Sequence, residues 1–209
     1  MLLSTAYFPP LSWLALAARD FRPGENPAII GLEACENYQK QSYRNRCYIL
    51  AGDGVQMLQV PVVHGDSWLI TDVRVDYSTP WVVRTQRALD TAYETSAYYE
   101  YYRDEVFSLL DAQPETLWEL NLSTLRFFLQ KTGIACELSP TATFAREEAD
   151  DFRNTLHPKR ENNILADLGL ERPYYQVFRD RMGGFTPKLS CLDLLFNEGP
   201  DSILWLKKL

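Results

Sequence analysis

The N-terminal segment shows strand, helix and strand patterns in succession. Residues 2–7 form a short apolar run that ends at Pro9-Pro10. The next apolar stripe has the i, i+3, i+4, i+7 spacing typical of a helix, and it consists of Leu11, Leu14, Ala15 and Ala18. Pro10 is well placed to start this helix. Residues 28–32 form a second, largely apolar run, so this order predicts a βαβ-like unit with parallel strands and a right-handed crossover.

Residues 47–76 predict antiparallel strands. The runs 47–51 and 55–63 are rich in β-forming residues, and the Gly52-Asp53-Gly54 sequence between them is typical of a hairpin turn. Residues 69–76 alternate apolar and polar side chains, which predicts a strand with one solvent-exposed face.

Beyond residue 77 the pattern is mainly helical. We expect helices at 78–102, 114–133, 144–155, 174–181 and 190–196. The helix at 114–133 is expected to be buried, and the one at 144–155 to be acidic and exposed. Residues 134–138 predict a last strand. The expected fold is one α/β (or α+β) domain over residues 1–209, strand-rich to about residue 76 and mainly helical from about residue 77.

Composition narrows the classes of function. The chain has 46% hydrophobic and 23% charged residues, as globular proteins do, and a net charge of −7. An acidic chain is poorly suited to nucleic acids or anionic membranes, because their phosphates must be met by Lys and Arg. The longest apolar run near the N-terminus, residues 13–18, is far shorter than the roughly 20 residues of a membrane helix. No cationic segment precedes this run, so we expect a cytoplasmic protein without membrane insertion.

The four cysteines predict free thiols. The closest pair, Cys35 and Cys47, is twelve positions apart, and neither a CxxC nor a paired histidine motif lies nearby. A chain of this length can build its core without disulfides. The motifs GxGxxG, GxxxxGK[ST], GxSxG and HExxH are also absent, so we expect no metal and no cofactor.

Residues 33–46 hold the densest group of hydrogen-bonding side chains. The cations Lys40, Arg44 and Arg46 lie among amides such as Asn37 and Asn45, directly after the predicted second strand. Ligands of α/β folds bind at such strand ends. Guanidinium forks and amides suit a phosphate, a carboxylate or a sugar. The alternative interpretation is a solvated loop.

Other candidates carry two interpretations each. His157, in His157-Pro158-Lys159-Arg160, is either an acid or base near neutral pH or a surface-loop histidine. His64 is either a catalytic residue after a strand or a turn histidine. The tyrosines of residues 98–102 form either a stacking platform for sugars or bases, or internal packing, which their helical spacing favours.

The chain resembles the WbqC-like family of bacterial proteins nearly from end to end. The matching segments are residues 4–10, 36–47, 72–76, 98–102, 156–160, 173–178 and 189–200, with Trp81 and Ala92-Tyr93. The most specific parts are Tyr43-Arg44-Asn45-Arg46 and Leu192-Asp193-Leu194-Leu195-Phe196-Asn197. The family is associated with bacterial surface-polysaccharide gene clusters, so the resemblance implies a role in sugar modification.

The resemblance also implies a set of ligand-binding residues. They are Tyr7, Pro9, Asn37, Lys40, Arg44, Asn45, Arg46, Asp193 and Asn197. The chain departs from the family pattern at Ser4-Thr5, where many relatives have Gln-Pro, and at Thr85, where many have His one helical turn after the Trp. If that His were the base in relatives, this chain would lack it.

Two functional hypotheses follow. The first is a cytosolic transferase acting on a nucleotide-activated sugar or a sugar amino group, with His157 as acid or base and the cations holding an anionic group. The second is a non-catalytic small-anion- or sugar-binding protein, or a scaffold. The first requires Arg44, Arg46, Asn197 and His157 to converge on one pocket. Donor, acceptor and oligomeric state are left open.

Overall fold

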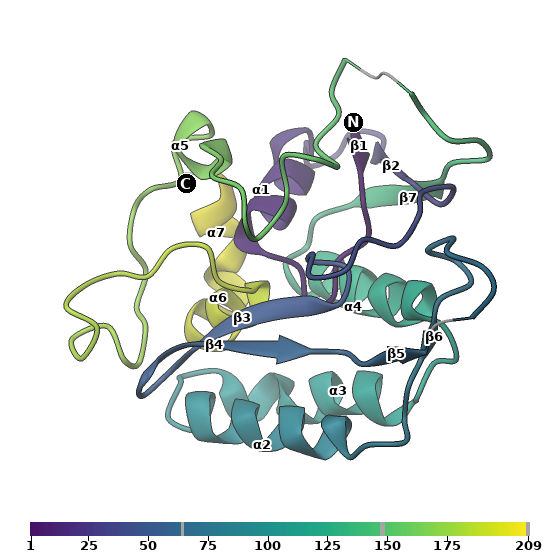
Figure 1. Ribbon diagram of the computed structural model, residues 1–209. Helices are drawn as coiled ribbons and strands as arrows, with labels where there is room; N and C mark the ends of the chain where they lie inside the picture. The colour runs from purple at the N-terminus through teal and green to yellow at the C-terminus, as the bar shows by residue number, and fades with distance from the viewer. Residues whose placement is uncertain (64, 147–148, 208–209) are drawn as a thin grey trace.

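A computed structural model of the chain contains a short parallel sheet with a helix between its first two strands (Figure 1). The structure describes residues 1–63, 65–146 and 149–207. Strands β1 (Leu2–Leu3), β2 (Ala28–Leu32) and β7 (Cys136–Pro140) pair in parallel in the order β1-β2-β7. Helix α1 (Leu11–Arg19) connects β1 to β2. The expected βαβ-like unit and the last strand are therefore confirmed.

Strand β1 is shorter than its apolar run. After Leu3 the chain leaves the sheet, and the backbone N–H of Tyr7 donates to the carbonyl of Tyr43 at 2.8 Å. Residues 4–8 are nevertheless buried. The apolar run therefore continues past the strand because these residues are buried, and not because they pair in the sheet.

The predicted hairpin is present. Strands β3 (Arg46–Ala51) and β4 (Gly54–Gln59) are antiparallel, and Ala51 pairs with Gly54 across the turn. The run 55–63 does not form one strand, because Pro61 has no N–H to donate and interrupts it. Its end, β5 (Val62–Val63), pairs with β6 (Arg74–Val75), which is the only named strand found within 69–76 in the described chain.

The helix expected over residues 78–102 is two helices. These are α2 (Trp81–Tyr93) and α3 (Tyr99–Asp111). Between them the backbone N–H of Tyr98 donates to the carbonyl of Phe196, 2.9 Å away, instead of continuing the helical ladder. Local periodicity missed this break because its partner lies far along the sequence.

The buried helix expected at 114–133 is confirmed as α4 (Leu117–Lys131). Its start is fixed by a capping box in which the Thr116 hydroxyl accepts from the backbone of Glu119 and the Glu119 carboxylate accepts from that of Thr116. Gly133, with φ +68°, follows the end of the helix.

The helices expected at 144–155 and 174–181 are wrong for the described residues, and residues 147–148 lie outside them. Residues 150–152 instead run beside β1, with backbone bonds from Leu2 to Asp150 and from Phe152 to Leu2. Residues 177–182 form turns. Helix α6 (Cys191–Glu198) confirms the one expected at 190–196, whereas α5 (Ile164–Asp167), η1 (Gly199–Asp201) and α7 (Ser202–Lys207) were not predicted.

The hairpin lies across the middle of the molecule, with α2 and α3 on one side and α1 and α6 on the other (Figure 1). Strand β3 contacts both α2 and α6. Buried residues from all of these elements form one hydrophobic cluster. Across the described residues, no helix is both long and apolar enough to cross a membrane. All four cysteines are free.

Candidate functional site

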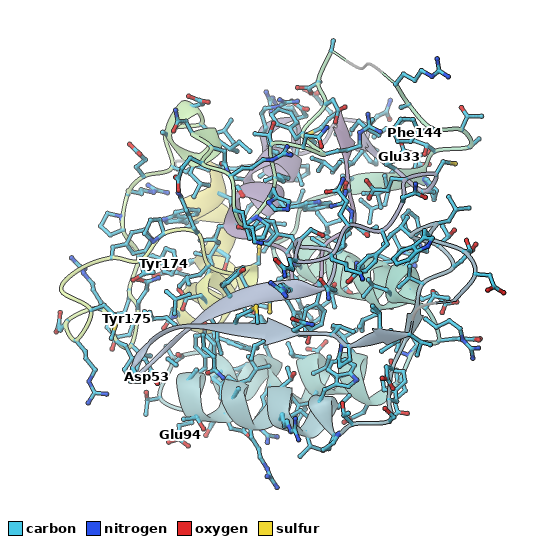
Figure 2. All side chains as sticks on the ribbon, in the orientation of Figure 1. Glu33, Asp53, Glu94, Phe144, Tyr174 and Tyr175 are labelled. Atoms are coloured by element: carbon cyan, nitrogen blue, oxygen red, sulfur yellow. The ribbon has the colours of Figure 1, made fainter. Side chains whose placement is uncertain are left out.

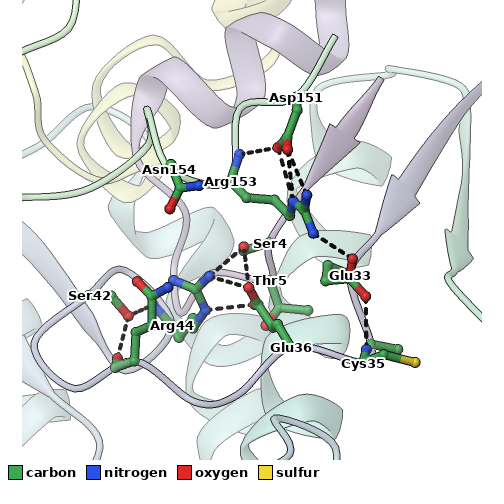
Figure 3. A network of polar contacts seen from close by, with 12 residues as sticks. Ser4, Thr5, Glu33, Cys35, Glu36, Ser42, Arg44, Asp151, Arg153 and Asn154 are labelled. Atoms are coloured by element: carbon green, nitrogen blue, oxygen red, sulfur yellow. Dashed lines mark hydrogen bonds and ion pairs between the residues drawn. The ribbon is translucent and has the colours of Figure 1, made fainter. Parts of the chain in front are cut away.

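Arg44 lies inside the molecule, in an ion pair with Glu36. Its Nε donates to Glu36 Oε1 at 2.7 Å, and its Nη2 donates to the other carboxylate oxygen and to Ser4 Oγ at 2.6 Å (Figure 3). Arg44 is 2% exposed and Glu36 is 5% exposed. The bidentate geometry satisfies both charges where water does not reach them. Arg44 therefore joins the segment after β2 to the chain that leaves β1.

A second buried carboxylate, Glu33, lies beside this pair (Figure 3). It accepts from Arg153 Nη1 at 2.6 Å, from the Thr141 hydroxyl at 2.6 Å and from the backbone N–H groups of Cys35 and Ala145. Arg153 also donates to Asp151, which holds the pKa of Arg153 above its usual value. The Arg44–Glu36 pair thus joins the chain after β2 to the chain after β1, and the Arg153–Glu33 pair joins the end of β2 to the segment that follows β7.

Helix α4 makes a further contact with the chain around the first pair. Asn121 is fully buried, and its Nδ2 donates to the backbone carbonyl of Arg44 at 2.8 Å and to Thr5 Oγ1 at 3.2 Å. These bonds hold the backbone of Arg44 in place, and with it the residues on either side.

Residues next to Arg44 line an open hollow of about 310 Å³. We call it the Lys40 hollow, and its lining residues are Tyr38, Lys40, Gln41, Asn45, Arg46, Gln59, Pro61 and Val62. The Lys40 ammonium lies 5.4 Å from the ring centroid of Trp68. Arg46 Nε donates to Gln59 Oε1 at 3.0 Å. Three of the predicted ligand residues, Lys40, Asn45 and Arg46, therefore share one hollow.

Asn45 is 3% exposed and is only partly satisfied. Its Nδ2 donates to the carbonyl of Val60 at 3.1 Å, whereas its Oδ1 has no hydrogen-bond partner within the described residues. A buried acceptor without a partner costs roughly 1–3 kcal/mol. The hollow thus contains a residue whose polar group is not fully used by the protein itself.

His157 lies near, but not in, this hollow. Burial, with Arg160 and Arg44 nearby, lowers the pKa of His157, which favours the neutral ring. The backbone N–H of Lys159 donates to His157 Nδ1 at 3.1 Å, so the ring proton is on Nε2. The Lys159 ammonium donates to Gln41 Oε1 on the rim of the Lys40 hollow.

Asp193 and Asn197 belong to a different buried centre. Asp193 accepts hydrogen bonds from Tyr93 at 3.0 Å, Tyr174 at 2.6 Å and Gln176 at 2.7 Å. Burial raises the pKa of Asp193 to about 6 despite these donors. Asn197 Nδ2 donates to the backbone carbonyl of Asp193, one helical turn earlier. Tyr174 lies on the side of the molecule opposite Glu33 and Phe144 (Figure 2).

The remaining predicted residues have structural contacts. Tyr7 is fully buried, and its hydroxyl has no hydrogen-bond partner in the part of the chain that the structure describes. Burial raises the pKa of Tyr7 well above its usual value. The carbonyl of Pro9 accepts from the backbone of Cys191, and Asn37 is exposed and forms a bridge with Leu69. Thr85 is buried in α2, one turn after Trp81.

The predicted site residues thus lie in separate parts of the molecule. Arg44, Arg46, Asn197 and His157 do not converge on one pocket: Arg44 and Asn197 are bonded inside the molecule, Arg46 lines the Lys40 hollow and His157 lies on a loop. Ligand binding and catalysis by the predicted residues stay predictions. His64 lies outside the described residues.

The tyrosines of residues 98–102 mainly serve packing, as their spacing favoured. Tyr99 is buried, contacts the Phe196 ring edge-on with centroids 4.9 Å apart, and donates to Asp90 at 2.8 Å. Tyr101 is 76% exposed. The cluster therefore does not present one aromatic face.

Sequence reasoning missed several partners of the buried charges. These are Glu33, Glu36, Tyr93, Asp151, Arg153, Tyr174 and Gln176. Glu33 carried a detectable signal, since it follows an apolar strand directly and a carboxylate there needs a partner. Nothing in the sequence pairs Gln176 with Asp193.

Comparison with known proteins identifies the family to which this chain belongs. The model of the WbqC-like protein family matches residues 30–169, which is more than half of the chain. This chain belongs to the WbqC-like family. It is also similar to "Uncharacterized protein Rv1507c" of Mycobacterium tuberculosis (strain ATCC 25618 / H37Rv), with 25% identity over 194 residues that cover 81% of this chain and 84% of the relative. No solved structure matches the chain significantly.

The WbqC-like match contains only part of the predicted site. It includes the Glu36–Arg44 pair, His157 and all the residues that line the Lys40 hollow. Tyr7, Pro9, Asp193 and Asn197 lie outside it. Neither the description of the WbqC-like family nor the name of the mycobacterial relative specifies a reaction.

We predict that Arg44→Ala destabilises the protein by roughly 3–5 kcal/mol, because it leaves Glu36 charged and buried without its partner. Denaturant unfolding measures the loss, with Arg126→Ala, at an exposed position of α4, as the control. The double variant Glu36→Leu/Arg44→Met should lose less than Arg44→Ala alone. A loss below about 1 kcal/mol in Arg44→Ala would contradict a buried pair.

We predict that Asp193 makes stability rise as the pH falls from 7 to 4. Its folded pKa of about 6 lies above the ordinary value of 3.8, so the folded state binds the proton first and is favoured by acid in this window. The unfolding free energy of the wild type should increase by roughly 2 kcal/mol relative to Asp193→Asn. Parallel pH dependences of the two proteins would show that Asp193 does not titrate there.

Proposed function

We propose that this WbqC-like protein binds a small anionic ligand, a sugar bearing a phosphate or a carboxylate, in the Lys40 hollow. The observation that carries the proposal is the composition of this hollow. Two cations, Lys40 and Arg46, line it together with the amides of Gln41, Asn45 and Gln59, and no carboxylate of the described residues lines it. The hollow thus provides positive charge on a chain whose net charge is −7.

The hydrogen-bonding groups of the hollow fit such a ligand. Arg46 uses only Nε on Gln59, so both Nη groups are available, within the described residues, for the bidentate contact that phosphate and carboxylate favour. Amides both donate to and accept from sugar hydroxyls.

The backbone position of Arg46 is also fixed before binding. Arg46 begins β3 and follows Arg44 and Asn45, whose backbone and side chains are fixed by Asn121, Glu36 and Val60. A site held in place by the fold loses little conformational entropy when a ligand binds.

We predict that Arg46→Gln weakens binding of UDP-glucose and glucose 1-phosphate about tenfold, because it replaces the charged guanidinium fork by a neutral amide. Isothermal titration measures the change, and added salt should weaken wild-type binding. Arg126→Gln, a matched change at an exposed arginine of α4, should bind as the wild type does. Absence of binding by the wild type, or equal binding by Arg46→Gln, would reject the site.

A second candidate function adds catalysis to this binding: transfer of a group to or from the sugar in the cytoplasm, during surface-polysaccharide biosynthesis. The feature that favours it is His157. Burial lowers its pKa, so the neutral ring carries a lone pair on Nδ1, and as a base the ring would exchange the N–H of Lys159 for the substrate proton there. Lys159 connects its loop to the rim of the Lys40 hollow. The non-catalytic interpretation is the alternative that this candidate must exclude.

We predict that His157→Gln lowers turnover of an activated sugar at least roughly 100-fold and leaves ligand affinity unchanged, because the base is lost and the cations remain. Mass spectrometry of lysate metabolites after incubation with each protein measures turnover. Substrate loss that persists in His157→Gln would exclude His157 as the base. No loss with the wild type would favour the binding protein.

A further inference from the structure

A second hollow is lined by a residue of the segment that also carries Lys40 and Arg46. Its volume is about 330 Å³, within the range of roughly 300–1,000 Å³ found for ligand pockets. Tyr43 lines it, whereas Gln41 and Asn45, two residues before and after, line the Lys40 hollow. We call it the Tyr43 hollow. The two hollows share no lining residue.

The lining of the Tyr43 hollow mixes apolar surface with uncharged polar groups. Phe185, Leu165 and Leu170 provide apolar surface. Within the described residues, the hydroxyls of Tyr43 and Ser12 and the Nδ2 of Asn162 form no hydrogen bond with the protein. These groups are available to a ligand, and burial, the largest influence, raises the pKa of Tyr43 to about 12, so its hydroxyl keeps its proton.

The charges of this hollow are opposite to those of the Lys40 hollow. Among the residues that the structure describes, Glu161 and Glu171 line it with one cation, Lys188. Lys188 donates to Glu161 in an ion pair that is largely exposed on both sides, and such pairs contribute little free energy. A phosphate or carboxylate would therefore meet an acidic rim, whereas an uncharged or amino-bearing ligand would not.

The wall that holds Phe185 and Lys188 is fixed by the fold. The Gln176 side chain bonds both the N–H and the carbonyl of Thr186, and Gln176 itself donates to Asp193. On the other side, the carbonyl of Leu189 accepts from the backbone of Leu11 at 3.0 Å. The buried Asp193 centre thus positions the wall from behind, and this gives the centre a role beyond packing.

We infer that the Tyr43 hollow binds a non-anionic monosaccharide unit, a hydroxyl-rich ring that is neutral or carries an amino group. Sugar C–H faces pack against rings such as Phe185, and hydroxyls bond to amides, hydroxyls and carboxylates, all of which line the hollow. The inference goes beyond the anion site, because it assigns a separate ligand class to separate residues. In a transferase this would be the place of the acceptor.

Saturation-transfer NMR tests the inference with glucose, galactose, mannose, glucosamine and N-acetylglucosamine, and with glucuronate as the anionic counterpart. At least one non-anionic sugar should bind the wild type and glucuronate should bind more weakly. Ala166→Trp places a large side chain at an exposed lining position of α5 and should abolish the signal. Tyr43→Phe should weaken binding about threefold to tenfold by removing one hydroxyl.

Tyr101→Phe, at a tyrosine that is 76% exposed on α3, is the matched control and should bind as the wild type does. Inorganic phosphate should not compete with the sugar, and Arg46→Gln should not change sugar binding. Failure of the anion site in the Lys40 hollow can therefore be told apart from failure of the sugar site. The inference is overturned if none of the non-anionic sugars binds, if phosphate displaces them, or if binding survives both Ala166→Trp and Tyr43→Phe.

Discussion

The buried ion pair between Arg44 and Glu36 is the constraint on which the middle of this molecule depends. An isolated charge is too costly to bury, so the two residues are held together by a bidentate contact, with Ser4 as a further partner. The pair joins the chain that leaves β1 to the chain that leaves β2. Because Asn121 of α4 holds the backbone of Arg44 as well, the hairpin, the parallel sheet and α4 meet at this point.

The side chains of the cation-rich segment, residues 40–46, point in different directions. Arg44 points inward to Glu36, whereas Lys40 and Arg46 line an open hollow. Tyr43, between them, lines a hollow with the opposite balance of charge. A chain that is acidic as a whole thus has two hollows of different charge lined from one short segment. Both surfaces obtain their positions from bonds made by their neighbours inside the molecule.

The structure also changes how the predicted site residues are interpreted. Asp193 was expected to contact a ligand, but it accepts three hydrogen bonds inside the molecule, and through Gln176 it fixes the wall of the Tyr43 hollow. Recurrence of a motif therefore does not separate residues that touch a ligand from residues that position its pocket. Lys40 and Arg46 line an open hollow, whereas Arg44 and Asp193 are bonded inside the molecule, and ligand contact by the first two stays a prediction.

Local sequence patterns were enough to predict the elements that have strong periodicity or a characteristic turn. These are the βαβ-like unit, the hairpin at Gly52-Asp53-Gly54, α4 and α6. It also indicated the cation-rich segment. Features whose hydrogen-bond partners lie far along the chain became visible only in the tertiary structure. The carbonyl of Phe196 ends the helix run near Tyr98, and the backbone of Leu2 holds residues 150–152 extended. Tertiary structure likewise decided that Arg44 turns inward while Arg46 does not, because the burial of a charge depends on a partner's position, which local patterns do not encode.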